Sequence, residues 1–131
     1  IKEESVTEQK NSLAVCLDNI LRHAGITRNT EYDLAQGKTA TTILSENMTG
    51  VQVLDLSGCT LDAVLYYVNQ DIPVLAILED GEAVLVTGFN EFNVVIMEPA
   101  TGKLYKKGMN DATAWFAENG NHFITYMRTE N

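Results

Sequence analysis

The feature that most constrains the fold of this chain is a change in hydrophobic periodicity at Pro73. Before Pro73, apolar residues recur at intervals of three and four, the spacing that places them on one face of an α-helix. After Pro73, they fall in short β-rich runs separated by turn-like pairs of residues. Helices that precede a strand-rich half predict an α+β fold with an antiparallel sheet, because a parallel doubly wound sheet needs strands and helices to alternate.

The pattern predicts these elements along the chain. Helices are expected over 12–24, 29–36, 38–47 and 60–68, with a late helix over 110–117. Strands are expected over 51–54, 74–78, 83–89, 93–97, 103–106 and 123–127. The predicted N-caps include Ser12 and Asn110, and Gly25 is the predicted stop of the first helix.

Length and charge bound the organisation and the partners. A chain of 131 residues fits one domain, which we place at 11–131, with residues 1–10 as a polar tail or linker. The net charge is −9 and the basic residues are scattered, so we expect no nucleic-acid partner. No apolar run approaches the ~18 residues of a membrane span, so we expect no membrane insertion. The chain has no initiating methionine or signal peptide, and we expect it to be part of a longer protein.

Cysteine and histidine are too few to indicate a metal or a disulfide framework. Cys16 and Cys59 leave open a single bridge between them. His23 and His122 are far apart and lack ligand spacing, so neither a metal nor a cofactor is expected. Nothing in the spacing of His122 connects it to Cys16, and we interpret it as a surface or turn residue.

Four segments together carry a resemblance to a known family. They are 12–17, 72–76, 81–89 and 94–102, which read SLAVCL, IPVLA, GEAVLVTGF and VVIMEPATG. In this order the chain resembles the papain-like cysteine peptidases that cut leader peptides from exported bacterial peptides. The resemblance implies a papain-like fold, with N-terminal helices, an antiparallel sheet and a late helix. It also implies three catalytic positions, which we assign to Cys16, Glu82 and Glu98.

The departures from the family's pattern predict a loss of activity. Glu82 stands where the family has its histidine, and Glu98 where it has its aspartate. Leu17, rather than glycine, follows Cys16, and Lys10 stands near the position of the oxyanion glutamine. An ionised carboxylate at position 82 would repel a thiolate and would be a poor acid for the leaving amine, tasks that an imidazole performs.

The position of Cys16 supports the same expectation. With Ser12 as the cap, Cys16 lies in the second turn of its helix, whereas the helix dipole acts within the first turn. Cys16 also falls on the apolar stripe, and free cysteine is among the most buried residue types. We therefore interpret Cys16 as an inert core residue.

The expected function is a non-catalytic, peptidase-like module of a larger bacterial protein, extracellular or at the cell surface. It would bind a peptide or a partner domain through the residual cleft. Glu82 and Glu98, with Glu79 or Asp80, would form an acidic groove for a basic peptide or a cation, unless they are ordinary hairpin and turn residues. Two alternatives stay open: an active cysteine peptidase that uses an unusual base, and a purely architectural domain.

Overall fold

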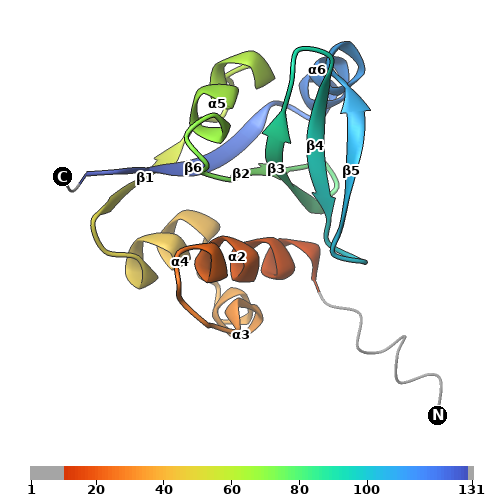
Figure 1. Cartoon of the computed structure of the whole chain (residues 1–131). Coiled ribbons are helices and arrows are strands. Elements are labelled where there is room, and N and C mark those ends of the chain that lie inside the picture. Colours follow the sequence, from red (N-terminus) through yellow and green to blue (C-terminus); the bar gives the residue numbers. More distant parts are fainter. Residues whose placement is uncertain (1–10, 130–131) are drawn as a thin grey trace.

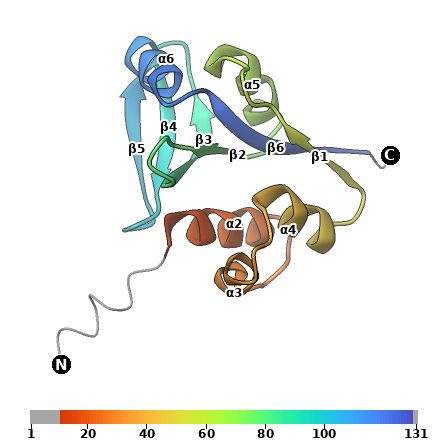
Figure 2. The ribbon, with the colours of Figure 1, turned by 180° about the vertical axis from the view of Figure 1, so that it is seen from behind.

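The computed structural model describes residues 11–129 and consists of one sheet between two layers of helices (Figures 1 and 2). The helices are α2 (Ser12–His23), α3 (Thr30–Ala35), α4 (Ala40–Asn47), α5 (Leu61–Val68) and α6 (Met109–Glu118). The strands are β1 (Val51–Asp55), β2 (Val74–Ile77), β3 (Ala83–Phe89), β4 (Asn93–Glu98), β5 (Lys103–Gly108) and β6 (His122–Arg128).

The six strands form a single antiparallel sheet in the order β1-β6-β2-β3-β4-β5. The hairpins β2-β3, β3-β4 and β4-β5 follow the chain, whereas β6 returns to lie between β1 and β2. The predicted α+β fold with an antiparallel sheet is confirmed. The predicted tail at 1–10 lies outside the described residues.

Two of the predicted N-caps are wrong. The cap of α2 is Asn11, whose side-chain oxygen accepts hydrogen bonds from the backbone N–H groups of Leu13 (2.8 Å) and Ala14 (3.3 Å). The Ser12 hydroxyl instead makes a long-range contact with β3. The cap of α6 is Gly108 rather than Asn110, because β5 runs directly into this helix without a linker.

One hydrophobic cluster joins α2 and α4 to the lower face of the sheet in Figure 1. Helix α2 buries its apolar stripe there, and none of the stripe's core side chains is exposed: Cys16, Leu17, Ile20 and Leu21. They pack with the strand residues Leu75, Ala83, Leu85, Met97, Ile124 and Tyr126. Each fully buried aliphatic side chain contributes about 1.5–3 kcal/mol of transfer free energy, so α2 is held firmly against the sheet.

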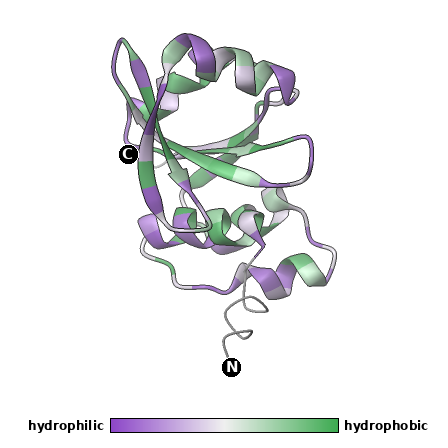
Figure 3. Ribbon diagram, turned by 90° about the vertical axis from the view of Figure 1, so that its right-hand side faces the viewer, coloured by the Kyte–Doolittle hydropathy of each residue, from purple (hydrophilic) through white to green (hydrophobic). Residues whose placement is uncertain are grey.

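A second cluster occupies the opposite face, beneath α5 and α6. Phe116 of α6 packs edge-on against Phe123 of β6, with ring centroids 5.3 Å apart. Trp115, the neighbour of Phe116, is half-buried, and the Lys107 ammonium lies 4.8 Å from its ring centroid. Phe116 therefore belongs to the core, whereas Trp115 packs against its edge. Figure 3 shows hydrophobic residues concentrated in the strands between the two helical layers.

A buried polar contact joins α2 to α3. The Thr30 backbone N–H and hydroxyl both donate to Asp18 Oδ1, at 2.8 Å and 2.7 Å, and the hydroxyl also lies 3.1 Å from the Ala14 carbonyl oxygen. Asp18 and Thr30 are both buried. Buried polar groups are costly when they lose a partner, so this contact fixes how α3 packs on α2.

We predict that Thr30→Val lowers the free energy of unfolding by about 1–3 kcal/mol, because the buried Asp18 carboxylate loses a donor. Chemical denaturation measures the change. Thr113→Val, which removes an exposed hydroxyl bonded within α6, is the matched control and should cost about 0.5 kcal/mol or less. Equal stability of Thr30→Val and the parent chain would contradict the importance of this contact.

Candidate functional site

The start of α2 meets the start of β3. Ser12 is the first residue of the helix, and its hydroxyl oxygen accepts a hydrogen bond of 2.9 Å from the backbone N–H of Ala83. Ala83 directly follows Glu82 in the chain and is buried, whereas Ser12 is half-buried. The side chain at the helix start that lies beside Glu82 is therefore Ser12.

Cys16 lies about 6 Å further along the axis of α2, because each residue of an α-helix rises about 1.5 Å. Its side chain is fully enclosed in the cluster between α2 and the sheet. Loss of solvent around the thiol raises the pKa of Cys16 to about 12, since burial disfavours the charged thiolate. At neutral pH the group is a neutral thiol packed among hydrocarbon side chains.

Glu82 belongs to the exposed turn between β2 and β3. Its carbonyl oxygen accepts from the Leu78 N–H at 2.7 Å, and its own N–H donates to Asp80 Oδ1 at 2.9 Å. Glu79, Asp80 and Glu82 are all exposed. The backbone of Glu82 closes the turn while its carboxylate stays in solvent, as in the alternative interpretation of this residue as part of a hairpin.

Glu98 ends β4 and closes the turn into β5. Its Oε1 atom accepts from the Thr101 hydroxyl at 3.1 Å, and its carbonyl oxygen accepts from the Gly102 N–H at 2.7 Å. Side chains alternate along a strand, so Glu98 shares the face of Ile96, which packs beneath α5 and α6. Cys16 packs on the opposite face. The structure thus encloses Cys16 in the core and leaves Glu82 and Glu98 in two turns. The pairing of Leu85 with Met97 puts these turns at the same end of the adjacent strands β3 and β4.

Neither described histidine lies beside these residues. His23 is two helical turns beyond Cys16, and its Nε2 atom lies 3.0 Å from the Asp71 carbonyl oxygen. His122 begins β6 and pairs with Ile77 of β2, which in turn pairs with Ala83 of β3. Two strand spacings put the backbones of His122 and Ala83 about 10 Å apart.

The two cysteines are free and lie on opposite faces of the sheet. Within residues 11–129, no group of three or more potential ligands among histidine, cysteine, aspartate and glutamate is placed to hold a metal ion. In the same range, no helix has the length and apolarity needed to cross a membrane.

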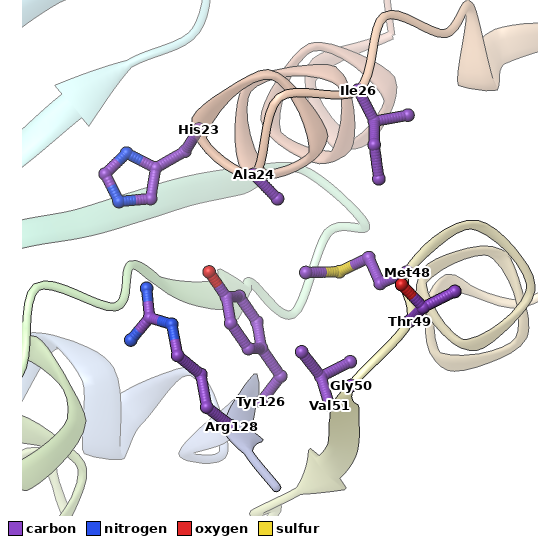
Figure 4. Close-up of a pocket in the computed structure, with 9 residues that line it drawn as sticks. All are labelled: His23, Ala24, Ile26, Met48, Thr49, Gly50, Val51, Tyr126 and Arg128. Atoms are coloured by element: carbon purple, nitrogen blue, oxygen red, sulfur yellow. The ribbon is translucent and has the colours of Figure 1, made fainter. Parts of the chain in front are cut away.

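A cleft of about 430 Å³ opens at the other end of α2 (Figure 4). It is lined by His23, Ala24, Ile26, Met48, Thr49, Gly50, Val51, Tyr126 and Arg128. Sequence reasoning missed it, because these residues come from three separate segments. The pairing of β1 with β6 joins two of them, and the packing of α2 against the sheet adds the third. The sequence contains one indication of this cleft: Tyr126 and Arg128 are two positions apart in the last strand, so their side chains lie on the same face of the sheet.

Comparison with known proteins supports the fold. No family model and no curated protein sequence matches the chain. Among solved structures, a protein from Bacillus anthracis provisionally described as a C39-like peptidase matches with a TM-score of 0.75, over 95% of this chain and 91% of that chain. The fold is papain-like. The two sequences are 14% identical, so the likeness extends to the fold alone. It confirms the fold that the four segments implied.

We predict that Cys16 of the folded papain-like domain resists alkylation, because its thiol is enclosed and its pKa is raised to about 12. Brief treatment with iodoacetamide near pH 8, followed by digestion and mass spectrometry, measures the labelling of each cysteine. Cys59 is partly exposed and serves as the internal control, which should label first. Labelling of Cys16 as fast in the native as in the denatured protein would contradict this.

Proposed function

We propose that this domain is a non-catalytic, papain-like module that binds a peptide or a partner domain within a larger bacterial protein outside the cytoplasm. The observation that carries the proposal is the complete burial of Cys16 in the cluster beneath the sheet. A nucleophile must reach a substrate carbonyl and must ionise, and this thiol meets neither condition.

The residue that stands in the nucleophile's place is, we propose, Ser12. The resemblance implies a cysteine that opens the first helix, and Ser12 is the first residue of α2. Its neighbour across the junction is Glu82, at the position that the resemblance assigns to histidine. A serine hydroxyl needs a base to take its proton, and an ionised glutamate in solvent is a weak one. The hydroxyl also accepts the Ala83 N–H, which uses one of its lone pairs.

Exposed apolar side chains support a binding role. Phe92, at the tip of the β3-β4 hairpin, is 70% exposed, and Leu104 of β5 is 60% exposed. Strand β5 is an edge of the sheet, so one side of its backbone is free to pair with an extended peptide. Lys103, Lys106 and Lys107 lie on this strand, which favours an acidic partner over a basic one.

The test of lost catalysis uses the purified domain, a thiol- and hydroxyl-reactive activity probe and a peptide library. We expect no turnover and no probe labelling, and we expect retention of extended acidic peptides. Cys16→Ala and Ser12→Ala variants assign any activity that is found. Turnover that disappears in either variant would overturn the non-catalytic assignment, and failure to retain any peptide would leave the purely architectural alternative.

The proposed junction makes a separate prediction with an engineered thiol. In Ser12→Cys, the new thiol should have a pKa that falls by about 0.5–1 unit when Glu82→Gln is added, because removal of the carboxylate ends its repulsion of the thiolate. The pH dependence of alkylation at this site, followed by mass spectrometry, measures the pKa.

Glu91→Gln is the matched control, since Glu91 is an exposed glutamate at the β3-β4 turn. It should leave the pKa of the engineered thiol unchanged. An equal pKa in Ser12→Cys with and without Glu82→Gln would show that the carboxylate at position 82 does not face the helix start.

A further inference from the structure

The cleft at the C-terminal end of α2 has an apolar wall and a polar rim. Ile26, Met48 and Val51 line one part of it, from the loop after α2, the end of α4 and the start of β1. Tyr126 and Arg128 reach it from β6. Small-ligand pockets typically have volumes of 300–1,000 Å³, and this cleft of about 430 Å³ falls in that range, with more polar than apolar surface in its lining.

The hydroxyl of Tyr126 is the polar group at the centre of this cleft. The residue as a whole is 2% exposed, yet its hydroxyl forms no hydrogen bond with any residue of 11–129. Within residues 11–129, every fully buried side-chain nitrogen or oxygen has a hydrogen-bond partner. The Tyr126 hydroxyl has none, so it is not fully buried and is exposed to the cleft. Figure 4 shows it pointing toward the end of α2, into the space below His23 and Ala24. Burial raises the pKa of Tyr126, so the phenol stays protonated and offers a donor.

Arg128 supplies a charge beside that hydroxyl. Its guanidinium carbon lies 5.9 Å from the centroid of the Tyr126 ring, and its side chain forms no ion pair within the described part of the chain. His23 lines the same rim, with its Nε2 atom 3.7 Å from Asp71 Oδ2. Arg128 is therefore the cation that is available to a ligand, while His23 is engaged by Asp71.

From this arrangement we propose that the cleft binds a small ligand, or a peptide end, that carries one carboxylate and one apolar group. The carboxylate would accept from Arg128 and from the Tyr126 hydroxyl. The apolar group would lie against Ile26, Met48 and Val51. This site is independent of the proposed function, since it lies at the opposite end of α2 from Ser12 and Glu82.

The surrounding charges favour a single carboxylate over a phosphate group. Two helices, α2 and α4, end at this cleft, and helix C-termini carry partial negative charge. Asp71, which lies beside His23, has 87% of its side chain exposed, and the net charge of the chain is −9. One guanidinium and one phenol can match one carboxylate, whereas a dianion would meet more repulsion than the site can offset.

The test compares N-acetyl-leucine with N-acetyl-leucinamide, which keeps the apolar side chain and removes the carboxylate. Binding to the full chain is followed by calorimetry or by shifts of backbone NMR signals. We expect the acid to bind about tenfold or more tightly than the amide, because a charge-assisted hydrogen bond is lost. A tripeptide with a free C-terminal leucine distinguishes the sources: tighter binding than the acid indicates a peptide end, and equal binding a small free acid.

Variants assign the binding to the cleft. Arg128→Gln should weaken the acid about tenfold, and Tyr126→Phe, which removes only the hydroxyl, should weaken it several-fold. Lys38→Gln is the matched control, because it removes one exposed positive charge that is paired with Glu46 and does not line the cleft, so it should change nothing. Equal binding of acid and amide, no measurable binding of either, or binding unaffected by both Arg128→Gln and Tyr126→Phe would overturn the proposal.

Discussion

The rest of this structure depends on how the apolar stripe of α2 packs against the sheet. Leu17, Ile20 and Leu21 are fully buried there, in contact with strands that are themselves brought together by the return of β6. Burial of this stripe sets both the rotation and the height of the helix over β2 and β3. The two ends of α2 then have defined neighbours: Ala83 at the N-terminal end and Tyr126 at the C-terminal end.

This packing explains why Cys16 is a poor candidate for catalysis. The same stripe that holds the helix includes Cys16, so the thiol cannot be exposed without pulling α2 away from the sheet. A catalytic thiol in this kind of fold benefits from the helix start, where backbone N–H groups are free and the dipole is positive. Here that place is occupied by Ser12, whose hydroxyl is engaged with the backbone of β3.

Each face of the sheet contains one of the two hydrophobic clusters and its own set of polar side chains. The face beneath α5 and α6 contains the second cluster, and strand alternation assigns Glu98 to that side, where its carboxylate is held by Thr101. The face beneath α2 and α4 contains the cleft with Tyr126 and Arg128. Glu82 and Glu98 therefore belong to two different turns at one end of β3 and β4, and neither shares the buried environment of Cys16.

The class of fold and the position of nearly every element could be predicted from the order of the amino acids. Strand β3 and the burial of the stripe of α5 could be predicted, because alternating or helical periodicity acts over a few neighbouring residues. The N-caps at Asn11 and Gly108 could not be predicted from the sequence. Ser12 does not cap α2, because its hydroxyl accepts a hydrogen bond from β3, and α6 begins at the end of β5. The enclosure of Cys16 could be predicted from its place on the apolar stripe, whereas the contact of Ser12 with the start of β3 and the meeting of Tyr126 and Arg128 with the end of α2 could not. These are contacts between residues far apart in the chain, and local periodicity contains no information about which distant segments will touch.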